Sequence, residues 1–181
     1  MISFSRVSKQ YGRQVLFVDA SFQLNPGEKV GLVGPNGSGK TTTMRIITGF
    51  LPATSGTVKV AGFDIFDDSF EARKRIGYLP ENPFFYDYLT AEELLNYFAG
   101  LFGLDAPGRR RRVAGVLDQV GIGAERRLQL RKFSKGMLQR VGIAQALLNE
   151  PELVILDEPM SGLDPIGRRD VRSLILQLRD R

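Results

Sequence analysis

A glycine-rich run near the start of the chain constrains its fold more than any other feature. The run Gly34-Pro35-Asn36-Gly37-Ser38-Gly39-Lys40-Thr41 fits the pattern G-x-x-x-x-G-K-[ST]. An apolar stretch over residues 29–33 predicts a strand before it, and apolar residues within 44–47 suit a helix after it. Glycines let successive backbone N–H groups turn toward one anion, and the N-terminus of the helix adds positive charge. The run therefore predicts a phosphate-binding loop.

The same run assigns chemistry to its last two residues. Lys40 is expected to reach the terminal phosphates of a nucleotide, and the Thr41 hydroxyl to bind Mg²⁺. Such a loop indicates a nucleoside triphosphatase or a kinase without choosing between them. The formal net charge of +5 suits an anionic ligand but identifies none. Since the sequence has no His and no Cys, imidazole acid–base chemistry, thiolate metal sites and disulfides are excluded.

The apolar pattern predicts strands in the first part of the chain and helices in the middle. Strand-like alternation covers residues 2–4, 15–17, 22–24, 57–61 and 76–79, with a turn at 25–27. Thr90 and Glu93 form a capping-box pattern at a helix start. Helical apolar stripes follow at Leu94, Phe98, Leu101 and Phe102; at Val113, Val116, Leu117 and Val120; at Met137, Val141, Ala144 and Leu148; and at Val171, Leu174, Ile175 and Leu178.

The order of these elements predicts the fold class. The continuous apolar run at residues 153–156 is typical of a strand buried on both faces. Strand and helix, a helical middle, then strand and helix predict an α/β fold with a parallel sheet. The uninterrupted apolar runs are only a handful of residues, against about 20 for a spanning helix. We expect a soluble chain without a signal peptide, so any membrane role must come through a partner.

Two carboxylates follow the apolar run at 153–156. Ligands of open α/β sheets bind beyond the carboxyl ends of the strands, where Asp157 and Glu158 are expected. Asp157 is placed to hold Mg²⁺, directly or through water. Glu158 is placed to orient and deprotonate an attacking water. The alternative for Glu158 is a structural role, at a helix start or in an ion pair with an arginine.

Two further motifs make the sequence resemble a known family. Phe133-Ser134-Lys135-Gly136-Met137-Leu138-Gln139-Arg140 lies before the acidic pair, and Ser161-Gly162-Leu163-Asp164 lies after it. The order of phosphate loop, Ser-x-Gly helix start, Asp-Glu-Pro and Ser-Gly-Leu-Asp resembles the ATP-binding cassette (ABC) ATPases. The likeness runs from about Tyr11 to the last residue. The Ser-Lys-Gly-Met form is similar to ATPase subunits of ABC-2-type exporters.

The resemblance implies an architecture with internal boundaries. It implies an α/β P-loop NTPase with a parallel core sheet, an N-terminal antiparallel β subdomain and an inserted helical subdomain. Residues 1–181 are expected to form one ABC ATPase domain that lacks its C-terminal end. Within it, about 1–89 and 149–181 form the ATP-binding core, and about 90–148 the helical subdomain with the signature motif. Because the family continues with a further strand and a switch histidine, we expect this chain to bind Mg-ATP but hydrolyse it poorly.

The resemblance also implies roles for individual residues. Nucleotide contacts fall on Tyr11, Gly34, Pro35, Asn36, Gly37, Ser38, Gly39, Lys40, Thr41, Thr42, Ser134, Gly136 and Asp164. Tyr11 resembles the aromatic that stacks on adenine; its alternative is a surface residue at a strand end. Ser134 and Gly136 resemble the signature residues that contact ATP held by the opposite subunit, and Asp164 the aspartate that communicates across that dimer. Glu158 is the implied catalytic base.

Two positions depart from the family pattern. Metal ligation is implied for Thr41, Asp157 and Glu81, but the family usually has Gln where Glu81 stands. A carboxylate binds Mg²⁺ more strongly and also adds negative charge beside ATP; the alternative is a solvated loop residue. Lys135 stands where the signature often has Gly. Its charge lies either near the phosphates or in solvent.

The resemblance implies a transport function and its partners. The chain is expected to be the ATP-binding and hydrolysing subunit of an ABC transporter, an exporter, with ATP and Mg²⁺ as cofactors. The implied partners are an integral membrane permease subunit and a second ATPase subunit, identical or related, in a head-to-tail ATP sandwich. No nucleic-acid partner is expected. The implied location is cytoplasmic, peripheral to the inner face of the cell membrane.

Aromatic and basic runs allow more than one interpretation. Phe84, Phe85, Tyr86 and Tyr88 are either core of the helical subdomain or a groove for a short helix of the permease. The basic residues are Arg109, Arg110, Arg111, Arg112, Arg126, Arg127, Arg131 and Lys132. They indicate a solvated surface or a neighbour of lipid headgroups, with nucleic-acid binding as the weaker alternative.

Competing functions explain fewer of the motifs. A non-transport ABC ATPase acting on ribosomes or DNA usually has two tandem cassettes or a long coiled-coil insertion. This chain has one cassette, and no sustained heptads lie between Glu81 and Ser134. A nucleotide kinase leaves the Ser-Lys-Gly-Met and Ser-Gly-Leu-Asp motifs unexplained. A GTPase is disfavoured because an Asn-Lys-x-Asp base motif is missing.

Overall fold

The chain folds into two compact units. The structure is a computed structural model that describes residues 1–28, 30–34 and 37–179. The first unit is Met1–Ile76 and the second is Gly77–Arg181. The second unit contains both the predicted helical subdomain at 90–148 and the acidic strand end. The subdomain boundaries expected from the resemblance stay a prediction.

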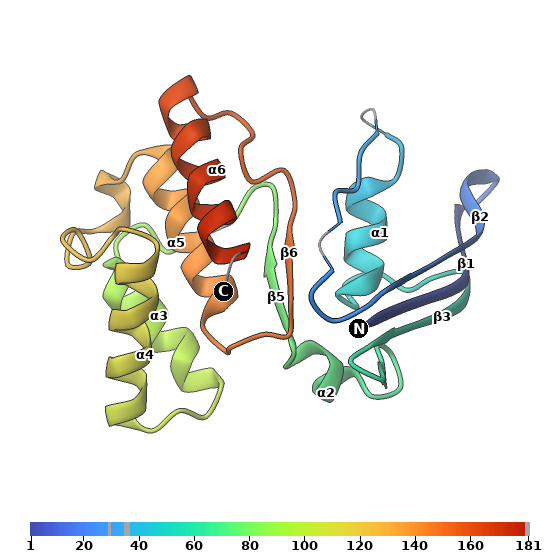
Figure 1. Ribbon diagram of the computed structural model, residues 1–181, viewed down its shortest axis with the longest axis horizontal. Helices are drawn as coiled ribbons and strands as arrows, with labels where there is room; N and C mark the ends of the chain where they lie inside the picture. The colour runs from blue at the N-terminus through green and yellow to red at the C-terminus, as the bar shows by residue number, and fades with distance from the viewer. Residues whose placement is uncertain (29, 35–36, 180–181) are drawn as a thin grey trace. The chain divides into compact units, whose positions relative to one another are not determined.

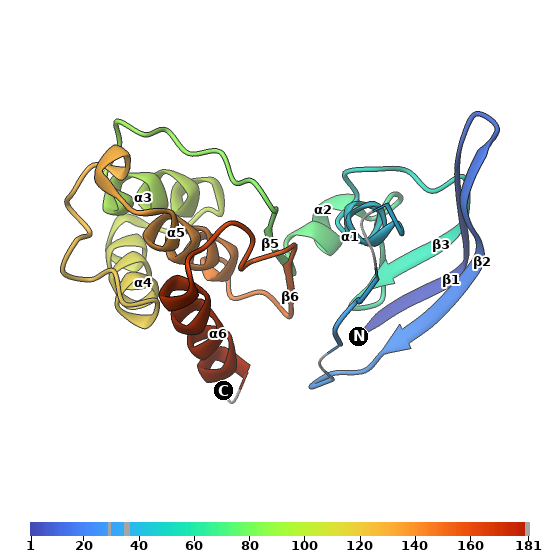
Figure 2. The ribbon, with the colours of Figure 1, turned by 90° about the horizontal axis from the view of Figure 1, so that it is seen from above.

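The first unit contains an antiparallel sheet of four strands. The strands β1 (Ile2–Tyr11), β2 (Gln14–Leu24), β3 (Ser55–Val60) and β4 (Phe63–Asp64) lie in the order β2-β1-β3-β4. The β1–β2 hairpin pairs Ile2 with Leu24 and Tyr11 with Gln14 (Figure 2). This sheet confirms the predicted strands near the N-terminus and at 57–61. The predicted turn also forms, with Glu28 N–H donating to the Asn25 carbonyl at 3.1 Å.

Two helices complete the first unit. Helix α1 (Lys40–Ile47) follows the glycine-rich run, and α2 (Ser69–Arg73) follows β4. Ile46 and Ile47 of α1 are buried, as are Phe4 and Val58 of the sheet. Because α1 contacts β3, the helix after the phosphate loop is fixed to the strands. The predicted helix after the loop is therefore confirmed.

The second unit places helices beside a pair of parallel strands. Strand β5 (Ile76–Leu79) pairs with β6 (Leu153–Leu156). The helices are α3 (Ala91–Leu101), α4 (Ala106–Gln119), α5 (Lys135–Leu147) and α6 (Pro165–Arg179), with a short 3₁₀ turn η1 (Leu130–Lys132). Figure 1 shows α5 and α6 on one side of the strand pair. The predicted strands and helices of this half are confirmed.

Local sequence signals explain where three helices begin. Thr90 and Glu93 form the predicted capping box of α3, in which each side chain accepts a hydrogen bond from the other residue's backbone N–H. The Asp105 side chain caps α4 by accepting from Gly108 N–H, and Ser134 caps α5 by accepting from Met137 N–H. The apolar faces of these helices meet in one core, which includes Leu94, Leu117 and Val141.

Two of the predicted strand features are wrong. Lys29 lies outside the described residues, and residues 30–33 lie outside the strands of the described chain. Val30, Leu32 and Val33 are 64, 46 and 92% exposed. An apolar run supplies strand-forming side chains but not the neighbouring strand whose hydrogen bonds define one. The run at 153–156 does form β6, yet Val154 is 39% exposed, since the helices of this unit lie on one side of the strand pair.

One predicted helical stripe is only partly buried. Leu94 lies in the core and Phe98 packs against it, but Leu101 and Phe102 are 66 and 43% exposed. Leu101 is the last residue of α3 and Phe102 is its C-cap, so both lie at the end of the helix. The residues predicted for the stripe of α4, Val113 to Val120, are all buried.

An arginine of α4 closes the C-terminal end of α5. Arg112 Nε donates to the Leu148 carbonyl at 2.9 Å, and its second nitrogen donates to the Leu147 carbonyl. Its third nitrogen forms an ion pair with Glu150 at 3.2 Å. The last carbonyls of a helix have no partner within the helix, so a guanidinium fork satisfies them well. Arg112 therefore joins α4 to the end of α5, whereas Arg110 and Arg111 are exposed.

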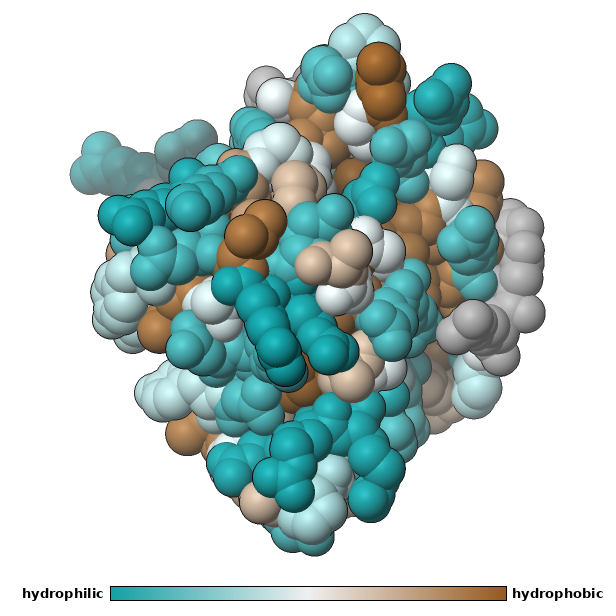
Figure 3. All heavy atoms as spheres, turned by 90° about the vertical axis from the view of Figure 1, so that its left-hand side faces the viewer, coloured by the Kyte–Doolittle hydropathy of each residue, from teal (hydrophilic) through white to brown (hydrophobic). Residues whose placement is uncertain are grey.

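One face of the second unit is predominantly polar. Figure 3 shows mostly hydrophilic side chains on one face, with hydrophobic ones scattered between them. Among the described residues, no helix has the length and apolar character needed to cross a membrane.

Candidate functional site

The phosphate loop is shaped by left-handed glycines and closed by its lysine. Gly37 and Gly39 have φ of 83° and 90°, a region that glycine adopts without steric cost. Gly39 is the N-cap of α1, and Lys40 Nζ donates to the Gly34 carbonyl at 2.6 Å. Pro35 and Asn36 lie outside the described residues. The loop therefore places the N-terminus of α1, Lys40 and the Thr41 and Thr42 hydroxyl groups in one short segment.

The β1–β2 hairpin lies directly against this loop. A Cβ built on Gly39 falls 3.2 Å from Leu16 Cδ2 and 3.5 Å from Phe17 Cδ1. Tyr11 lies at the end of β1, opposite Gln14, and its side chain is 49% exposed. The predicted base platform and the predicted phosphate loop thus share one region of the first unit. The half-exposed ring suits stacking and equally suits a strand-end surface residue.

The signature residues occupy the N-terminus of α5. Ser134 accepts a hydrogen bond from Met137 N–H at 3.2 Å, and Gly136 has open space around its Cα. A Cβ built on Gly136 meets only Ser134 Oγ, at 3.9 Å. Free backbone N–H groups at the start of a helix attract anions, especially where no side chain blocks the approach. This geometry suits a phosphate group.

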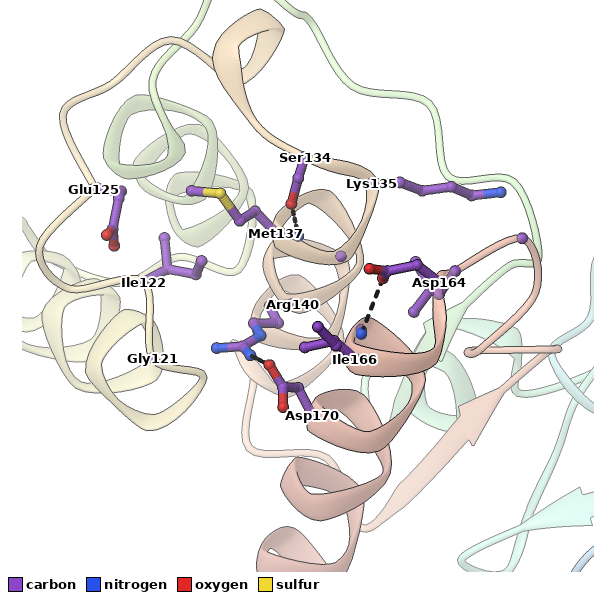
Figure 4. A pocket seen from close by; sticks show the side chains of 14 residues that line it. Gly121, Ile122, Glu125, Ser134, Lys135, Met137, Arg140, Asp164, Ile166 and Asp170 are labelled. Atoms are coloured by element: carbon purple, nitrogen blue, oxygen red, sulfur yellow. Dashed lines mark hydrogen bonds and ion pairs between the residues drawn. The ribbon is translucent and has the colours of Figure 1, made fainter.

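A pocket of about 580 Å³ opens in front of the signature residues. Figure 4 shows Ser134 at the start of α5, and Met137 and Arg140 on that helix, facing Asp164, Ile166 and Asp170 of the α6 segment. Ile122 and Glu125 line a third side. Asp164 accepts from Gly167 N–H at 3.0 Å and thereby caps α6. Arg140 forms an ion pair with Asp170 at 3.1 Å, which joins α5 to α6 within the pocket.

Lys135 reaches the second of the late motifs. A Cβ built on Gly162 falls 2.1 Å from Lys135 Nζ, so the ammonium group lies directly beside Gly162. Figure 4 shows the side chain extended away from Ser134. Of the two expected placements, the structure has Lys135 along the 161–164 loop at the edge of the pocket. Gly162 has φ of 65°, a backbone conformation that glycine adopts without steric cost.

The acidic pair follows β6, where the sequence places it. Asp157 is 1% exposed, and its N–H donates to the Leu79 carbonyl of β5 at 2.9 Å. Glu158 is exposed and has φ of 48°. A non-glycine residue in this region carries strain, which is frequent at functional sites. The strained backbone turns Glu158 out of the strand line, while Asp157 stays buried at the strand end.

The residues proposed for Mg²⁺ have suitable chemistry. Asp157 provides a carboxylate and Thr41 a hydroxyl at the first turn of α1. Mg²⁺ that binds with a nucleotide needs only one or two carboxylates, because phosphates and water complete its octahedron. In the described part of the chain, no three His, Cys, Asp or Glu residues gather into a self-sufficient metal site. Taken separately, the Asp157 carboxylate and the Thr41 hydroxyl are each suited to a metal that arrives with its nucleotide.

Glu81 and the aromatic run after it lie largely in solvent. Glu81 is exposed, and Phe84, Tyr86 and Tyr88 are 88, 44 and 61% exposed. Only Phe85 packs against the core of the second unit. The interpretation of all four aromatics as core is wrong for three of them. Tyr86 lies between its neighbours, with ring centroids 6.1 Å from Phe84 and 6.0 Å from Tyr88.

Comparison with known proteins shows which family the chain belongs to. The sequence profile of the family described as ABC transporter matches residues 17–161. The chain belongs to the ABC transporter family. An uncharacterized ABC transporter ATP-binding protein of Synechocystis is 50% identical to this ABC transporter chain over 162 residues, which are 88% of the chain and 45% of that protein.

Two relatives of the ABC transporter chain carry descriptive names. The bacitracin transport ATP-binding protein BcrA of Bacillus licheniformis is 41% identical over 98% of the chain and 57% of its own length. The linearmycin resistance ATP-binding protein LnrL of Bacillus subtilis is 37% identical over 99% of the chain and 58% of its own length. The chain spans about half the length of the curated relatives it matches.

Solved structures confirm the fold of the ABC transporter chain. An ATP-binding subunit of an ABC transporter superposes with a TM-score of 0.84 at 33% identity, covering 99% of this chain and 75% of that one. The cbiO1 protein of Clostridium perfringens, part of the complex cbiONQ, gives 0.88 at 25% identity, covering 99% and 73%. The predicted P-loop ABC fold is therefore confirmed.

Some residues that line the pocket of the ABC transporter chain were not predicted from the sequence. Arg140 and Asp170 are 30 residues apart, and Glu125 lies in an irregular segment. Arg140 is the last residue of the motif at 133–140, whereas Glu125 and Asp170 belong to none of the motifs. Arg140 is the one arginine of α5, but no sequence pattern indicates that its partner is Asp170, which lies on α6.

Proposed function

We propose that the chain is the ATP-binding and ATP-hydrolysing subunit of an ABC transporter of the exporter type. The observation that carries the proposal is the phosphate loop, with Gly39 packed against the hairpin that bears Tyr11. Family membership and the names of BcrA and LnrL support transport over a role on ribosomes or DNA.

The proposed chemistry needs few residues. The loop amides and Lys40 hold the phosphates, and Tyr11 stacks on the base. Thr41 and Asp157 would hold Mg²⁺, which neutralises phosphate charge, while Glu81 remains a proposed third ligand. Glu158 holds the attacking water and accepts its proton. Phosphoryl transfer depends mainly on positioning and charge neutralisation, so this set suffices in principle.

The proposed assembly is a head-to-tail pair. The open start of α5 at Ser134 and Gly136 receives the terminal phosphate of ATP bound to the other subunit, and Asp164 lies beside it. An integral membrane permease converts closure of this pair into transport. The subunit is proposed to be cytoplasmic and peripheral to the inner face of the membrane. The exposed run at Phe84, Tyr86 and Tyr88 is the proposed contact with the permease.

Phosphate release by the purified full chain in Mg-ATP tests the enzymatic part. Glu158→Gln should lower the turnover rate about 10²–10⁴-fold and leave ATP binding intact, because it removes a proton acceptor. Lys40→Ala should weaken ATP binding itself. The matched control Glu71→Gln, on the surface of α2, should change neither quantity. The slow hydrolysis expected of residues 1–181 stays a prediction, which the same assay measures. Full activity of Glu158→Gln would contradict its role.

Copurification tests the transport part. The tagged full chain is isolated from detergent-solubilised membranes, and its partners are identified by mass spectrometry. A multi-spanning membrane protein supports the proposal and indicates the class of cargo. Ribosomal or DNA-associated partners without any membrane protein would overturn it in favour of the non-transport alternative.

A further inference from the structure

Lys9 is a lysine in an unusual place. It lies on β1 of the first unit with only 7% of its surface exposed. Lysine side chains are rarely this buried, because removing an ammonium group from water is costly unless partners replace the hydration. The position of Lys9 therefore depends on the groups that surround its Nζ.

Two partners hold that ammonium group. Nζ donates to the Pro52 carbonyl at 2.8 Å and lies 4.9 Å from the centroid of the Tyr11 ring. Within the residues that the structure describes, Lys9 forms no ion pair with a carboxylate. Its charge is therefore not neutralised, and one face of the Tyr11 ring carries part of the compensation. A cation–π contact strengthens when the cation is desolvated.

The contact links two parts of the predicted nucleotide site. Lys9 and Tyr11 are two residues apart on β1 and so project on the same face of the strand. Pro52 lies in the segment between α1 and β3, which is also joined to β1 where Thr54 N–H donates to the Ser8 carbonyl at 2.9 Å. Because α1 begins at the phosphate loop, Lys9 ties the Tyr11 ring to the segment that leaves the phosphate-loop helix.

We propose that Lys9 is a positioning residue for the nucleotide base. It covers one face of the Tyr11 ring, fixes the ring relative to the phosphate loop, and leaves the opposite face for a purine. The cation also draws electron density from the ring, which favours stacking on an electron-rich base. This inference rests on the proposed function, since it requires that the chain binds ATP.

A double-mutant cycle on nucleotide binding tests the proposal. Affinities of the full chain for ATP and for inorganic tripolyphosphate, which lacks a base, are measured for wild type, Lys9→Met, Tyr11→Leu and the double variant. Lys9→Met should weaken ATP binding about three- to tenfold and leave tripolyphosphate binding unchanged. In the Tyr11→Leu background it should have no further effect, because it acts through the ring.

Two further variants control for folding. Lys59→Met makes the same change on the exposed face of β3 and should alter neither affinity. Lys9→Arg keeps a cation that stacks on aromatic faces and should restore most of the ATP affinity. The melting temperature of each variant shows whether the sheet remains folded.

The outcomes separate the two proposals. The role of Lys9 would be overturned if Lys9→Met weakened the affinities for ATP and tripolyphosphate equally. It would also be overturned if Lys9→Met weakened ATP binding as much in the Tyr11→Leu background as in wild type. Neither result would contradict ATP binding by the wild-type chain. If wild type binds tripolyphosphate no more weakly than ATP, the base is not recognised, and the role of Lys9 fails with it. If wild type binds neither, the proposed function fails as well.

Discussion

At the scale of single residues, close backbone contacts limit what the sequence tolerates. A Cβ on Gly77 falls 2.0 Å from the Ala146 carbonyl oxygen and 2.8 Å from its carbon, and neither atom can rotate away. Gly77→Ala should therefore lower the free energy of unfolding by about 3 kcal/mol, measured by urea denaturation. Gly115→Ala is the matched control: nothing lies within 4 Å, so it should stabilise α4 by about 0.5–1 kcal/mol. Equal midpoints for the two variants would contradict this packing.

Glu93 is the residue whose protonation should affect α3. The hydrogen bonds from the Thr90 backbone N–H and hydroxyl, both 2.9 Å, hold the pKa of Glu93 below its ordinary value of 4.5. A lowered pKa means that this stabilisation is present above the unfolded value and is lost as the pH falls through the folded value. We expect Glu93→Gln to reduce the acid dependence of unfolding below about pH 4.5.

An NMR titration measures that pKa directly. In Thr90→Val the hydroxyl donor is gone, so the pKa of Glu93 should rise toward 4.5. A pKa at or above that value in wild type would rule out the ionised capping box. The sequence predicted this pair because its partners lie three residues apart. The contact of Lys9 with Pro52 spans 43 residues, and no local pattern indicates it.

At the scale of elements, one side chain adds hydrogen bonds to the packing of α4 against α5. Arg112→Ala should destabilise the second unit by about 1.5–3 kcal/mol, because charge-assisted bonds to two helix-end carbonyls are lost. Denaturant midpoints measure this loss. The neighbouring Arg110→Ala, from the same basic run, should stay within about 0.5 kcal/mol of wild type. A similar loss of stability in Arg112→Ala and Arg110→Ala would show that the basic run stabilises the unit through its overall charge.

The elements also show where sequence patterns are sufficient. The helices of the second unit were predictable, since each combines a period of 3.6 residues with a local start signal such as Ser134. Strand features were less predictable, because they depend on distant neighbours. Residues 30–33 have a strand-like apolar sequence but form no strand in the structure. Val154 is exposed, although the sequence predicted a strand that is buried on both faces. The signature residues are predictable from their spacing, whereas Arg140 and Asp170 come together only through the fold.

At the scale of the whole molecule, the proposed pair makes a distinct prediction. Glu158→Gln with Mg-ATP should elute as a dimer in size-exclusion chromatography, because uncleaved ATP stays between the subunits. Gly136→Asp in that background should remain monomeric. Space around Gly136 admits a side chain without disturbing α5, but a carboxylate there repels phosphate.

Two controls accompany this measurement. Gly136→Asn fills similar volume without charge and should weaken the dimer less than Gly136→Asp. Lys40→Ala should be monomeric because it binds ATP poorly. If Glu158→Gln stays monomeric at saturating Mg-ATP, the head-to-tail arrangement is wrong for this chain.

The end groups of α5 have hydrogen-bond partners at both termini, which should slow the exchange of its amide hydrogens with solvent. Ser134 accepts from the first turn, and Arg112 binds the last carbonyls. Fraying normally begins where end groups lack partners, so the amides of α5 should be among the slowest in the second unit to exchange with solvent. The helix that presents the signature residues is thus expected to move as a rigid body, without losing its terminal turns.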